Sequence, residues 1–87
     1  MLKVKVTEDN LLNGLSALFR ARNCPVALAI KDISIDKDSV MVGYDYAWSD
    51  GVSYKIPINI RKIIINYDLN MNMEPIEFEL AESEQQV

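Results

Sequence analysis

Acid–base chemistry in this 87-residue chain would depend on carboxylates, because the sequence contains no histidine. Asp45 with Asp50, or Glu77 with Glu79, are the pairs whose spacing could serve proton transfer. In a strand, residues i and i+2 share a face, so Glu77 and Glu79 would be neighbours on a solvated edge strand and not in a cleft. We therefore assign no catalytic residue and expect a protein that is not an enzyme.

Nucleophilic and metal chemistry are equally restricted. Cys24 is the single cysteine; it has no histidine to act as its base and can form neither an internal disulfide nor a thiolate cage. We interpret it as a small buried hydrophobic residue. Asp36, Asp38 and Ser39 resemble the start of a calcium loop, but the later glycine and glutamate of an EF-hand are absent, so we predict a turn there. The three glycines are too scattered for a phosphate-binding loop. No metal and no cofactor are predicted.

Four aromatic residues follow one another at alternate or nearby positions: Tyr44, Tyr46, Trp48 and Tyr54. On an open sheet such rings can stack nucleobases. Residues 32–54 are net negative, however, so the basic groove that nucleic acids need is missing. We expect most of these rings to form a core under a helix, with Trp48 near a hairpin tip able to anchor a protein partner.

Negative charge is concentrated toward the end of the chain. Residues 64–87 carry six acidic and no basic side chains, within a net charge of -4. Such a stretch steers basic partners and repels phosphates, although glutamates that only keep a strand and tail soluble are the simpler interpretation. The residues that we predict to contact a partner are Trp48, Asp50, Asp68, Glu74, Glu77 and Glu79.

The elements that must position these side chains begin with an alternating segment. Residues 2–7 place apolar and polar side chains on opposite faces, which predicts a half-buried strand. Thr7 is a suitable N-cap, and leucines at helical spacing predict a helix over 8–22. Pro25 then prevents its continuation.

The remaining segments are predicted as strands: 26–35 with a bulge at Lys31–Asp32, then 40–48, 52–60, 63–69 and 76–80. A helix beginning at Pro57 competes with this assignment, because Ile60 and Ile64 also fit helical spacing. Four isoleucines between 58 and 64 favour the strand.

Two hairpin turns compete after Trp48. A two-residue loop, Asp50–Gly51, would pair Tyr46 with Lys55 and place the two apolar rows on opposite faces. A three-residue loop, Ser49–Gly51, would pair Tyr46 with Tyr54 and place both rows on one face. Because register follows the buried face, we predict the three-residue loop.

The predicted fold is α+β, with one N-terminal helix packed on an antiparallel meander of five to six strands (β-α-β-β-β-β-β). The domain would span residues 1–80, followed by an acidic flexible tail at 81–87. The helix would cover the face that carries Leu28, Tyr46, Tyr54 and Tyr67. The opposite face would be small and flat and could join two copies of the chain; its residues are Ala27, Ala29, Met41, Gly43 and Ala47.

These observations favour a non-enzymatic protein-binding module. A small acidic inhibitor, immunity or anti-defence protein that binds a basic protein partner stoichiometrically would suit them, including a version whose carboxylates imitate nucleic-acid phosphates. The alternative is a homodimer that binds a small ligand or nucleotide on its aromatic face. Direct nucleic-acid binding is not expected. The lack of an apolar leader or a membrane-length apolar run, with one free cysteine, leads us to expect a cytoplasmic protein.

Overall fold

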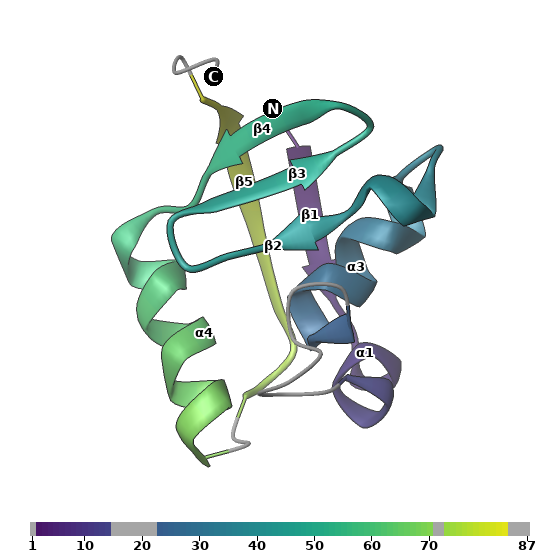
Figure 1. Cartoon of the computed structure of the whole chain (residues 1–87). Helices are drawn as coiled ribbons and strands as arrows, with labels where there is room; N and C mark the ends of the chain where they lie inside the picture. The colour runs from purple at the N-terminus through teal and green to yellow at the C-terminus, as the bar shows by residue number, and fades with distance from the viewer. Residues whose placement is uncertain (1, 15–22, 71–72, 84–87) are drawn as a thin grey trace.

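The computed structural model describes residues 2–14, 23–70 and 73–83, and its architecture is α+β, as predicted (Figure 1). The elements in chain order are β1 (Leu2–Val6), α1 (Glu8–Asn13), α3 (Pro25–Ile33), the 3₁₀ turn η2 (Lys37–Ser39), β2 (Met41–Val42), β3 (Tyr46–Ser49), β4 (Val52–Lys55), α4 (Ile58–Asn70) and β5 (Ile76–Glu82).

The five described strands form one antiparallel sheet in the order β1-β5-β4-β3-β2. β5 pairs with β1 along five residues but with β4 along only two. As a result β2, β3 and β4 cross in front of β1 and β5, and the sheet is curled (Figure 1). The expectation that 76–80 is an edge strand is wrong, because β5 lies between β1 and β4. It also runs two residues further, to Glu82.

The predicted strand and helix cap at the N-terminus are confirmed. The Thr7 Oγ1 accepts a hydrogen bond from the Asn10 backbone N–H (3.2 Å), and the Asn10 Oδ1 accepts from the Thr7 N–H (2.8 Å), which is a complete capping box. The single helix predicted over 8–22 is not confirmed. α1 ends at Asn13, and the following Gly14 is extended. Gly14 packs against Pro25 so closely that a Cβ would lie 2.5 Å from the proline ring. Residues 15–22 lie outside the described residues.

Residues 25–33 form a helix, so the strand predicted for 26–35 is wrong. Pro25 occupies the first turn, where a missing N–H costs nothing, and so it begins this helix. The Cys24 Sγ caps it by accepting from the Ala27 N–H at 3.4 Å, and Cys24 is buried as predicted. The short apolar run around Ala27 and Ala29 fits a buried helix as well as a buried strand.

Residues 58–70 also form a helix, α4, so the strands predicted for 52–60 and 63–69 are wrong beyond Lys55. The competing interpretation of a helix beginning near Pro57 is correct: the Pro57 carbonyl accepts from the Arg61 N–H at 2.9 Å. Ile60, Ile64 and Tyr67 are buried at helical spacing. Burial of this stripe outweighs the strand preference of isoleucine, which is a weak influence beside tertiary packing.

The β3–β4 hairpin has the two-residue loop, and the predicted three-residue loop is wrong. Ala47 pairs with Tyr54 and Tyr46 pairs with Lys55. Asp50 (φ 52°) and Gly51 (φ 80°) both have positive φ, as the tight hairpin turn that matches strand twist requires. The two apolar rows of the hairpin therefore lie on opposite faces of the sheet.

The inner face of the hairpin mixes residues of the two predicted faces. Ala47, which we predicted on the open face, pairs with Tyr54, which we predicted under the helix. Ala47 and Val42 are fully buried on this inner face, in one core cluster with Ile60 and Ile64 of α4, whereas Tyr46 lies on the other face. Tyr46 and Trp48 are therefore not part of a core under a helix, whereas Tyr54 packs against the core from the inner face. The main buried side chains are Val4, Val6, Val26, Ile30, Val40, Val42, Ala47, Ile56, Ile60, Ile64 and Leu80. Among the described residues, no helix has the length and apolar character needed to cross a membrane.

Candidate functional site

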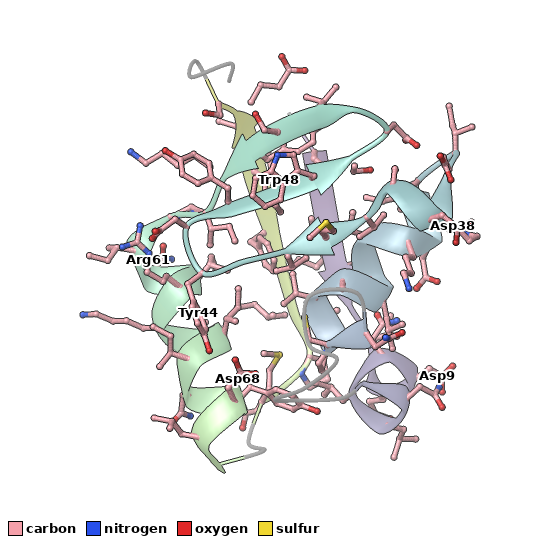
Figure 2. The ribbon with its side chains drawn as sticks, in the orientation of Figure 1. Asp9, Asp38, Tyr44, Trp48, Arg61 and Asp68 are labelled. Atoms are coloured by element: carbon pink, nitrogen blue, oxygen red, sulfur yellow. The ribbon has the colours of Figure 1, made fainter. Side chains whose placement is uncertain are left out.

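The outer face of the β2–β3–β4 hairpin carries the most distinctive exposed surface of the described chain. We call it the hairpin face; its residues are Met41, Tyr46, Trp48, Ser53 and Lys55. Register brings them together, because Trp48 lies opposite both Met41 and Ser53, and Tyr46 lies opposite Lys55. Trp48 is 41% exposed, and its ring lies 6.3 Å from that of Tyr46 at a tilt of 43°. Figure 2 shows Trp48 lying over the strands of the hairpin.

The loop between β2 and β3 fixes one end of this face to α4. The Tyr44 hydroxyl donates to the Asp68 Oδ2 at 2.6 Å, and the Arg61 Nη2 lies 3.1 Å from the Asp45 Oδ1. Tyr44 reaches toward Asp68 in Figure 2. Asp68, which was predicted to contact a partner, is therefore engaged within the chain. Its contact holds the hairpin in place relative to α4.

Asp50 fixes the other end. Its carboxylate accepts from the backbone N–H groups of Asp36 (2.7 Å) and Ile35 (3.0 Å), while its own N–H donates to the Ser39 Oγ (2.7 Å). The amides of Asp36 and Ile35 lower the pKa of Asp50 below the usual aspartate value. The sequence predicts Asp50 as a partner contact, whereas its hydrogen bonds to residues 35, 36 and 39 give it a positioning role. Nothing local in the sequence indicates this, because its partners are 14 and 15 residues away.

The other predicted acidic contacts are separated from the hairpin face. Glu77 and Glu79 lie opposite Lys5 and Lys3 on the β1–β5 pair, and the Lys5 Nζ is 3.8 Å from the Glu77 Oε1. Such an exposed ion pair contributes little to stability, but the lysines of β1 neutralise the negative charge of these two glutamates. Glu74 lies elsewhere, in a groove beside α4. The acidic residues therefore do not gather on one surface.

The five residues of the predicted dimer patch are also divided. Ala27, Ala29 and Ala47 are completely buried inside the chain, Met41 belongs to the hairpin face, and Gly43 lies in the β2–β3 connection. The predicted turn at Asp36–Ser39 is the η2 segment, in which the Asp36 Oδ1 accepts from the Asp38 N–H. Within the described ranges, no three His, Cys, Asp or Glu side chains are grouped so that they could hold a metal ion.

Comparison with protein-family models, with curated proteins and with solved structures finds no match to this chain.

Proposed function

We propose that this chain is a non-enzymatic protein-binding module whose contact surface is the hairpin face. The observation that carries the proposal is the pair of neighbouring rings of Tyr46 and Trp48, left partly exposed on β3, whose other face is buried at Ala47 and Ser49. Tryptophan and tyrosine are the residues most often found at the energetic centre of protein interfaces.

Rigidity supports this role. The hairpin is tied to α4 through Asp68 and to the loop before η2 through Asp50. A surface that is ordered before binding loses less conformational entropy when a partner docks. The hairpin face is thus ready to contact a partner without rearrangement.

The proposed partner is a protein, and the chain would act by one-to-one occupation of that protein's surface, as an inhibitor or immunity protein does. Charge alone does not select the partner, because Glu77 and Glu79 face lysines and Asp68 bonds to Tyr44. We therefore propose that the partner is recognised mainly by the aromatic rings of the hairpin face. Binding should then depend only weakly on salt concentration.

A comparative capture experiment tests the proposal. The wild-type chain, Trp48→Ser and Leu12→Ser are immobilised and exposed to extract from the source cells. Leu12 is a matched control, because it is an exposed leucine on α1, away from the hairpin. A partner retained by wild type and Leu12→Ser but lost by Trp48→Ser is the expected result. A partner retained equally by all three chains would overturn the assignment of the hairpin face.

The competing function is a small planar ligand held against the same rings, which stacking on Tyr46 and Trp48 would permit. Trp48 is the only tryptophan, so its emission reports directly on this surface. Quenching of that emission by micromolar nucleotides or nucleobases would favour the ligand function over the protein-binding one.

A further inference from the structure

The exposed side of α4 is a second apolar surface, separate from the hairpin face. Ile58, Ile65 and Leu69 are 66%, 37% and 77% exposed, although Ile60 and Ile64 on the same helix are buried. A helix at a protein surface normally has one apolar stripe and one polar face. α4 has two apolar stripes, and only one of them is covered by the rest of the described chain.

The second stripe has the spacing of a helix–helix contact. Positions 58, 62, 65 and 69 follow one another at intervals of four, three and four residues, which is the pattern of a coiled-coil seam. Lys62 is the polar member of this ridge. A single lysine at such a position lowers stability but fixes which helices pair and in which register.

A groove runs beside the ridge. It is formed between α4 and the chain that leads into β5, has a volume of about 600 Å³ and is lined by Lys62, Ile63, Asn66, Met73, Glu74, Pro75 and Ile76. Lys62 and Glu74 bring opposite charges to this groove. Neither forms an ion pair with another described residue.

We propose that α4 and this groove form the interface of a homodimer in which the two α4 helices pack antiparallel about a two-fold axis. An isologous contact joins the same surface of both copies, so Ile58 of one copy meets Leu69 of the other and the ridge of each copy lies along the groove of its partner. Lys62 of each copy then pairs with Glu74 of the other. In this arrangement the charges of Lys62 and Glu74 complement each other across the two-fold axis.

A dimer of this kind needs both the ridge and the groove. A stable pair needs about 1,000 Å² of total buried area, or about 500 Å² from each copy. α4 is about 20 Å long, so its narrow ridge needs the adjoining groove to reach that area. Of the described helices, α4 lies on the opposite side of the molecule from α1 and α3, so a second copy can approach its outer side (Figure 1).

Sedimentation equilibrium tests the dimer. The full chain should show a monomer–dimer equilibrium, and Leu69→Glu should raise the dissociation constant by about 100-fold or more, because one substitution removes a leucine from both halves of the contact. Leu12→Glu, which changes an exposed leucine on α1, should leave the dissociation constant unchanged. A chain that stays monomeric up to about 1 mM, or a dimer that Leu69→Glu does not weaken, would overturn the proposal.

A charge-reversal mixture tests the contact between Lys62 and Glu74 across the interface. Lys62→Glu alone and Glu74→Lys alone each place like charges opposite one another in a homodimer, so each should associate about tenfold more weakly than wild type. Mixed in equal amounts, they should form a heterodimer, because each glutamate then meets a lysine of the other copy. Pairing between these two residues within one chain cannot produce this result. A mixture that associates no better than the separate variants would refute the assigned register. Trp48→Ser should dimerise normally, so this test is independent of the proposed function.

Discussion

Neighbouring isoleucines in α4 provide a sharp test of the fold. Ile64 is 2% exposed and Ile65 is 37% exposed. Truncation of Ile64 to alanine removes three carbons that are fully buried, which costs about 2.4 kcal/mol in transfer free energy. The cavity left behind adds to this, so we expect Ile64→Ala to lower the free energy of unfolding by about 2–4 kcal/mol.

Ile65→Ala should cost about 1 kcal/mol or less. Part of the Ile65 side chain already contacts water, no enclosed cavity forms, and alanine has the higher helix propensity. The assay is urea unfolding followed by far-ultraviolet circular dichroism, at a low protein concentration so that self-association does not contribute. If residues 63–69 formed a strand with Ile63, Ile65 and Tyr67 facing inward, the order would reverse. A larger loss for Ile65→Ala than for Ile64→Ala would therefore refute the helix and its buried stripe.

Three further predictions concern the contacts that hold the fold together. Thr7→Ala should lower the free energy of unfolding by about 1 kcal/mol in chemical denaturation, because the capping box is lost; an unchanged midpoint would contradict this. Gly14→Ala should lower the thermal midpoint, at a cost of about 1–3 kcal/mol, since its Cβ would lie 2.5 Å from the Pro25 ring; a neutral effect would mean that the two residues are not packed together. For Asp50→Asn, the loss of stability should be full above the ordinary aspartate pKa of about 3.9 and should shrink as the pH falls through the lowered pKa of folded Asp50, because protonation removes the same carboxylate acceptor; a pH-independent difference between wild type and variant in urea unfolding would argue against this account.

The two ends of the chain could be predicted from sequence because their patterns allow one interpretation. Leu2, Val4 and Val6 alternate strictly with lysines, as Ile76, Phe78 and Leu80 do with glutamates, and these two strands pair with each other. Thr7 followed by two acidic residues indicates a helix start whatever the helix packs against.

The middle of the chain could not be predicted in the same way. α4 carries isoleucine on both sides, so helical and alternating spacing are both present, and only packing against the curled sheet selects the helix. Pro25 can end one helix or begin the next, and the sequence alone does not decide between these roles.

The prediction of the candidate site depended on how many helices cover the sheet. Predicting a single helix required both apolar rows of the hairpin to share one face, which led to the wrong loop at Asp50–Gly51. Once α3 and α4 cover the face of Val42 and Ala47, the row of Tyr46 and Trp48 faces outward. Trp48 is exposed on the hairpin face, and its contact with a partner stays a prediction. The positioning role of Asp50 arises from long-range backbone contacts that no local pattern indicates.

Calorimetric titration of the purified partner protein into wild type and Trp48→Ser, at matched salt, tests the proposed function most directly. The hairpin-face account predicts one-to-one binding to wild type, and it predicts that Trp48→Ser weakens the affinity by about 30-fold, the loss typical of a central interface tryptophan. Equal affinities for the two chains would contradict the account and would place the contact on another surface of the molecule.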